Sequence, residues 1–163
     1  MENNKKLVVY YSYTGHTKMI AESIQKKLGC DILEIKPVKP YSTDYQTVVD
    51  EEQNNESLNK TPEIQKIDKN LRDYDEIIIG SPVWWYTIAP VIRTFLKEND
   101  LSGKVIAPFA TNAGWLGQTF QEIKRLCPSS KVEKGMDIVF TSDYHENQLV
   151  TSPDEIDNWI NKL

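Results

Sequence analysis

The fold is decided near the N-terminus by the stretch Leu7-Val8-Val9-Tyr10-Tyr11-Ser12-Tyr13-Thr14-Gly15-His16-Thr17. Its first half, residues 7–11, is an unbroken apolar run rich in valine and tyrosine, which predicts a strand buried on both faces. Residues 15–28 follow with apolar side chains at helical spacing, and Gly29 is typical of a helix C-terminus. Residues 30–35 alternate apolar and polar side chains and predict a second strand.

The alternation of strand and helix continues to the end of the chain. Further strands are expected at 75–82, 104–110 and 136–140, and further helices at 89–99, 118–126 and 152–163. The region from residue 36 to residue 72 is the least regular. There we expect a helix from Thr43 or Asp44 to about Asn54, a polar loop over 54–61, and a short helix from Pro62 to Leu71.

This order predicts an α/β fold, because strands connected through helices lie parallel in one sheet with helices on both of its faces. The sheet is expected to have five strands. With 163 residues and 39% apolar composition, the chain fits one compact domain spanning residues 1–163.

Charge and composition exclude several classes of protein. A net charge of -5, with lysines scattered among acids, argues against a nucleic-acid partner. The two cysteines have no Cys-x-x-Cys spacing, so no metal site is expected. The apolar run near the N-terminus is too short for a signal peptide or a membrane span, and we expect a soluble, cytoplasmic protein without a membrane partner.

Ligands of open parallel sheets bind beyond the carboxyl ends of the strands, so the loops after the first, third and fourth strands are the candidate site. The first loop consists of Ser12, Tyr13, Thr14, Gly15, His16 and Thr17. Its hydroxyl groups, its glycine and the N-terminus of the following helix suit a terminal phosphate. The alternative is that the hydroxyl residues only cap the helix.

The second and third loops carry aromatic and small residues. The second contains Pro82, Val83, Trp84, Trp85 and Tyr86, and at least one of its aromatic side chains is expected to stack on a flat ligand. The third contains Thr111, Asn112, Ala113, Gly114 and Trp115, where small residues let backbone N–H groups approach a ring edge. The alternatives are a buried aromatic cluster for the second loop and an ordinary glycine-rich turn for the third.

Rival motifs are absent from the sequence. It has no G-x-G-x-x-G after the first strand and no G-x-x-x-x-G-K-[ST], which excludes a Rossmann dinucleotide site and a nucleoside triphosphatase. The positions where a phospho-receiver needs acids hold Tyr11-Ser12 and Gly80-Ser81. Neither histidine has an evident nucleophile–base partner, and His145 is taken as a loop residue, so no side chain is assigned a catalytic role.

Together these residues resemble the flavodoxin family. The first loop is similar to that family's S/T-x-T-G-x-T phosphate loop, and residues 80–90 resemble a subgroup with a double-tryptophan loop. The resemblance covers nearly the whole chain and implies a three-layer sandwich with strand order 2-1-3-4-5. It also implies FMN as cofactor, with its phosphate on residues 12–17 and its ring against 82–86 and 111–115.

Three features depart from that resemblance. The commonest flavodoxins have a glycine in the loop after the third strand, whose backbone turns over on one-electron reduction, whereas residues 83–86 contain none. Carrier flavodoxins are usually far more acidic than -5. Trp115 stands where many relatives have a small hydroxyl residue.

The sequence leaves three functions open. The favoured one is an FMN-dependent oxidoreductase that takes electrons from NAD(P)H or another small donor and passes them to a quinone-like or other small acceptor. The second is a one-electron carrier between redox partner proteins, and the third is a flavin-free regulatory module on the same fold. A homodimer that covers the aromatic rim is compatible with any of them.

Overall fold

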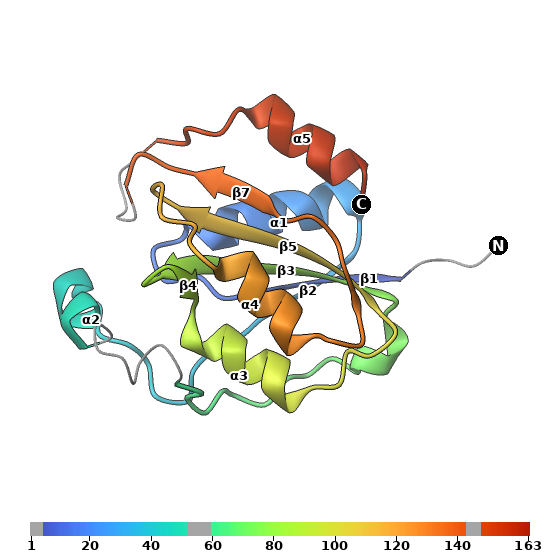
Figure 1. Cartoon of the computed structure of the whole chain (residues 1–163), viewed down its shortest axis with the longest axis horizontal. Coiled ribbons are helices and arrows are strands. Elements are labelled where there is room, and N and C mark those ends of the chain that lie inside the picture. Colours follow the sequence, from blue (N-terminus) through green and yellow to red (C-terminus); the bar gives the residue numbers. More distant parts are fainter. Residues whose placement is uncertain (1–4, 52–59, 143–147) are drawn as a thin grey trace.

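The structure is a computed structural model that describes residues 5–51, 60–142 and 148–163. A parallel sheet forms the middle layer, with α1 (His16–Leu28) and α5 (Pro153–Asn161) on one face and α3 (Pro90–Glu98) and α4 (Thr119–Leu126) on the other (Figure 1). The predicted α/β sandwich is therefore confirmed. In this described part of the chain, no helix is long and apolar enough to cross a membrane.

The sheet has the predicted strand order. The strands β2 (Asp31–Glu34), β1 (Lys6–Tyr10), β3 (Glu76–Trp84) and β5 (Val105–Asn112) lie side by side and parallel. The fifth position is shared by two short strands, β6 (Lys131–Val132) and β7 (Met136–Val139), which pair with opposite ends of β5. The strand expected at 136–140 is confirmed as β7, whereas the short strand β6 before it was not predicted. Between them the ring of Phe120 lies against Gly135 and leaves no room for a Cβ atom.

Alternation along β1 divides the core into two clusters. Leu7 and Val9 point toward α3 and α4, whereas Val8 and Tyr10 point toward α1 and α5, because successive side chains of a strand face opposite sides of the sheet. Both sets are buried. The apolar run is thus continuous because both faces of the sheet are covered.

The helix predicted from Pro62 to Leu71 is wrong. Residues 62–70 contain no helix; Ile64 bridges Pro37, and the N–H of Gln65 donates to the carbonyl oxygen of Lys36 at 2.7 Å. Because these backbone groups bond to a distant segment, they are not available for helical bonds. Only a 3-10 turn, η2 (Leu71–Asp73), follows.

The other uncertain helix is present as α2 (Tyr45–Glu51), which begins next to the predicted cap. Its predicted continuation to Asn54 lies outside the described residues, as do most of the 54–61 loop and His145. α2 lies on the side of the molecule toward which the arrows of β3, β5 and β7 point (Figure 1). It is therefore placed beside the candidate site.

Candidate functional site

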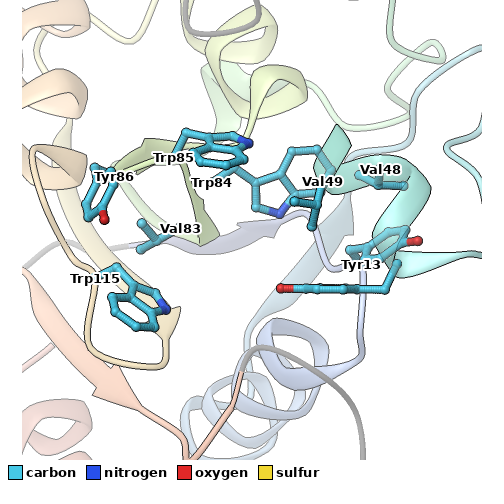
Figure 2. A pocket seen from close by; sticks show the side chains of 9 residues that line it. Tyr13, Val48, Val49, Val83, Trp84, Trp85, Tyr86 and Trp115 are labelled. Atoms are coloured by element: carbon cyan, nitrogen blue, oxygen red, sulfur yellow. The ribbon is translucent and has the colours of Figure 1, made fainter. Parts of the chain in front are cut away.

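Two adjoining cavities lie at the carboxyl ends of the strands. The larger, of about 290 Å³, is lined by Tyr13, Tyr45, Val48, Val49, Val83, Trp84, Trp85, Tyr86 and Trp115 (Figure 2). The smaller, of about 40 Å³, is lined by Tyr13, Thr14, His16, Tyr45, Pro82, Val83, Trp84 and Thr111. Because four of these residues line both cavities, the two form one cleft with an aromatic end and a more polar end.

The polar end contains the N-terminus of α1. Gly15 is its N-cap residue, with a φ of 103°, and no side chain in the described part of the chain caps the helix. Ser12 bends the loop by accepting a hydrogen bond from the N–H of Gly15 to its Oγ at 3.1 Å. The first turn of α1 also carries no acidic residue. Helix N–H groups without a capping side chain, at the positive end of the dipole, form an anion site.

The hydroxyl residues of this loop do not cap the helix, which was the alternative role considered for them. The hydroxyl of Thr17 bonds that of Thr111 at 2.7 Å, and both side chains are buried. This bond ties the start of α1 to the end of β5. The ring of His16 stacks on Phe140 at 4.3 Å between centroids, which fixes the side chain that borders the smaller cavity.

The second predicted loop is a β-hairpin. β3 continues through Trp84, pairs with β4 (Thr87–Ile88) in antiparallel register, and leaves Trp85 and Tyr86 as a two-residue turn. Their φ angles are 52° and 67°, so both lie in the left-handed region despite the absence of glycine. Such hairpin turns normally use Asn and Gly, and a residue with a Cβ costs about 1–2 kcal/mol there.

The three aromatic residues of this hairpin all line the larger cavity but are held differently. Trp84 is anchored, because its ring makes edge contacts with Tyr41, Tyr11 and Tyr13 at centroid distances of 5.0, 5.8 and 5.9 Å. Trp85 and Tyr86 are 37% and 57% exposed. They present apolar surface to the cleft and to solvent, which is unusual unless the surface meets a ligand.

The third loop is shaped by Asn112. Its buried side-chain oxygen accepts hydrogen bonds from the N–H groups of Gly114 at 2.8 Å and Trp115 at 2.9 Å, and its amide donates to Asp137 at 2.6 Å. These bonds hold Trp115, which is 49% exposed, across the cavity from Tyr13. Direct contact between the Asn112 side chain and a ligand stays a prediction.

The structure brings most of the predicted site residues to the cleft. The exceptions line neither cavity and instead shape the loops around them; they are Ser12, Gly15, Thr17, Asn112, Ala113 and Gly114. Sequence reasoning missed the wall formed by α2, from which Tyr45, Val48 and Val49 face the cavity (Figure 2). Their spacing of three and four residues was a visible signal of one helix face, but nothing in the sequence showed what that face meets.

The cleft is almost free of charge. Every residue that lines the larger cavity is aromatic or aliphatic, and His16 is the one basic side chain at the smaller cavity among the described residues. The described residues also contain no cluster of three His, Cys, Asp or Glu side chains that could hold a metal ion. The arrangement therefore suits a ligand with one anionic group and a flat, largely apolar ring.

Solved structures share this fold across the whole chain. A flavoprotein in complex with FMN from Lactobacillus acidophilus NCFM is 28% identical, with a TM-score of 0.72 over 96% of this chain and 99% of that one. The crystal structure of a protein from Bacteroides eggerthii DSM 20697, which is described as a flavoprotein, is also 28% identical in sequence, with a TM-score of 0.76 over 98% of each chain.

Sequence comparison points the same way. Flavodoxin 1 from Salmonella typhimurium is 26% identical over 106 residues, which are 63% of this chain and 46% of that protein. The match thus spans about half the length of these curated relatives. The profile of the family described as Flavodoxin matches residues 5–163. With nearly all of its sequence matched, this chain belongs to the flavodoxin family.

Proposed function

We propose that this chain binds FMN in the cleft and works as an oxidoreductase between a small electron donor and a small acceptor. The N-terminus of α1 would hold the phosphate, because it offers N–H groups without a capping side chain or a nearby carboxylate. The aromatic cavity would hold the ring, because Trp84, Tyr86 and Trp115 offer flat apolar surface there. The Lactobacillus acidophilus flavoprotein, solved in complex with FMN, supports FMN as the ligand.

The chain's own residues supply binding and orientation, while bound FMN supplies the redox chemistry. Val83 and Trp84 close the inner side of the cavity, and the α2 residues Val48 and Val49 exclude water from its far wall. Since the residues around the proposed ring site carry no charge, a neutral, planar acceptor such as a quinone would approach the bound ring at a lower desolvation cost than a charged one.

The observation that carries the oxidoreductase proposal is the fixed hairpin turn. A one-electron carrier of this family uses a backbone group beside the flavin that turns over on reduction. Here the carbonyl of Tyr86 accepts a hydrogen bond from the N–H of Gln118 at 2.7 Å. Rotation of that peptide would break this bond and displace an aromatic side chain, which favours a turn that keeps one conformation.

Two measurements test the proposal. The FMN-loaded protein should oxidise NADH or NADPH in the presence of a benzoquinone or naphthoquinone, and no turnover with any donor and acceptor pair would refute the enzymatic role. In an anaerobic reductive titration, visible absorption should pass directly from the oxidised to the fully reduced flavin. A stable blue intermediate stage at half reduction would favour the carrier and its protein partners instead.

The flavin-free alternative is tested by a charge at the phosphate site. Gly15→Asp places a carboxylate beside the N-terminus of α1 and should abolish FMN binding. Gly103→Asp is the matched control, because both glycines are exposed, have positive φ, and have open space where a Cβ would lie. Normal FMN affinity in Gly15→Asp would refute the phosphate assignment. If the wild-type protein stays colourless when FMN is added, the flavin-free regulatory module is the function that remains.

A further inference from the structure

The turn formed by Trp85 and Tyr86 is stabilised by residues from a distant part of the chain. Both residues have left-handed backbone angles that side chains disfavour, so the turn needs support from its surroundings. Both residues line the larger cavity and remain 37% and 57% exposed. The support comes from the segment Gly117–Glu122, which leads into and begins α4 and lies outside the candidate site.

The first support acts on Tyr86. The N–H of Gln118 donates to its carbonyl oxygen at 2.7 Å. Gly117 lies so close that a Cβ built on it would be 2.3 Å from that oxygen and 2.5 Å from the Cβ of Tyr86. Only glycine leaves room for this approach, and its own φ of 55° is also left-handed.

The second support acts on Thr87, the residue directly after the turn. Its hydroxyl donates to the carboxylate of Glu122. Arg93, which is 1% exposed, holds the same carboxylate through Nε at 2.8 Å and Nη2 at 3.1 Å, and its Nη1 donates to the carbonyl oxygen of Lys60. A two-point ion pair fixes the carboxylate in one orientation, so Thr87 is held by a rigid partner.

We infer that Gly117 and Glu122 are positioning residues for the flavin. They hold the hairpin turn in the strained conformation that presents Trp85 and Tyr86 to the cofactor ring. This inference rests on the proposed function, because it takes the aromatic cavity as the ring site. Neither residue lines that cavity, so each acts through Tyr86 or Thr87.

The contact of Gly117 is tested by a pair of alanine substitutions. Gly117→Ala and Gly29→Ala both place a Cβ on a glycine of similar left-handed φ, 55° and 62°, but only Gly117 has a neighbour within 4 Å. Both variants should lose stability in urea. Only Gly117→Ala should also bind FMN about tenfold more weakly and change the near-ultraviolet circular dichroism of the apoprotein. Equal FMN affinity in the two variants would overturn the role of Gly117.

The contact of Glu122 is tested through its partner, because removal of the carboxylate would leave Arg93 buried without a counter-charge. Thr87→Val removes the hydroxyl at nearly constant volume and should weaken FMN binding and shift the visible spectrum of the bound flavin. Thr87→Ser keeps the hydroxyl and should restore both. If Thr87→Val loses stability but keeps the wild-type affinity and spectrum, the contact is structural and the inference fails.

The proposed function and the positioning role are refuted by different results. If the wild-type protein binds no FMN, the proposed function is refuted. If the wild-type protein binds FMN and all four variants bind it equally well, only the positioning role is refuted.

Discussion

The hydroxyl pair between Thr17 and Thr111 gives a quantitative test of how the phosphate loop is joined to the sheet. The two oxygen atoms lie 2.7 Å apart, and the residues are 1% and 3% exposed. Thr17→Val therefore leaves the Thr111 hydroxyl buried without this partner, and Thr111→Val does the same to Thr17. An unsatisfied buried hydroxyl costs about 1–3 kcal/mol, which is the expected loss of unfolding free energy for either single variant.

The double variant with both Thr17→Val and Thr111→Val should lose less unfolding free energy than the two single variants lose in sum. Replacing both partners by apolar groups of the same shape leaves no hydroxyl unsatisfied and is close to neutral. We therefore expect a coupling free energy of about 1 kcal/mol or more in a double-mutant cycle. The measurement is urea unfolding of the apoprotein, followed by circular dichroism.

A second cycle supplies the control. The hydroxyl of Thr94 in α3 donates to the carbonyl oxygen of Pro62 at 2.7 Å, on the opposite face of the sheet from α1. Thr94→Val and Thr17→Val share no partner, so their effects should add within about 0.3–0.5 kcal/mol. If Thr17→Val and Thr111→Val are additive within the same limit, the hydroxyl pair does not couple the loop to β5 and the reasoning is refuted.

Three further predictions concern pH and the cleft wall. Burial raises the pKa of Glu122, but the hydrogen bonds from Arg93 and Thr87 have the larger combined effect and lower this pKa below the usual 4.5. The ionised carboxylate therefore stabilises the fold at neutral pH, and this stabilisation is lost as the pH falls through the lowered pKa. The urea midpoint of Glu122→Gln should therefore fall less on acidification than that of the wild type. Burial first, and then the charges of Glu34 and Glu22, raise the pKa of Tyr10 from 10.0 to about 12. The neutral tyrosine therefore contributes to the free energy of unfolding below pH 10, and this contribution is lost as the pH rises toward 12. Tyr10→Phe should reduce the loss of stability between pH 10 and pH 12. A carboxylate in the apolar wall, Val49→Asp, should raise the dissociation constant for FMN measured by fluorescence quenching, whereas Val38→Asp, at an exposed site outside the cavities, should not.

The parts of the fold that the sequence predicted are those with local causes. Apolar runs buried on both faces, such as residues 7–11, and helix ends marked by Gly29 depend on neighbouring residues alone. The same holds for the local structure of residues 12–17, where Gly15 and the start of α1 follow directly from a buried strand. These elements were found because their pattern is complete within a few residues.

The parts that were missed depend on distant partners. Pro62 is a good first residue for a helix, yet its carbonyl oxygen accepts a hydrogen bond from Thr94 and its segment pairs with residues 36–38. Left-handed angles at Trp85 and Tyr86 contradict local preference, and Tyr86 is held by its contacts with Gly117 and Gln118, more than thirty residues away in sequence. Local rules failed here because long-range bonds compensate the local cost.

The fixed turn leads to one more expectation, about the redox potential of the bound cofactor. A protein shifts a potential only by binding the oxidised and reduced forms with different affinity, and it needs different contacts to the two forms to do so. The clamped Tyr86 carbonyl offers no contact that changes on reduction, whereas the uncharged wall of the larger cavity disfavours a negatively charged reduced ring. Midpoint potentials of bound FMN, measured by dye equilibration, should therefore lie below those of free FMN, by about 60 mV for each tenfold loss of affinity for the one-electron-reduced form. Potentials above those of free FMN, with the first one-electron potential well above the second, would show that the turn responds to reduction and would favour the one-electron carrier over the oxidoreductase.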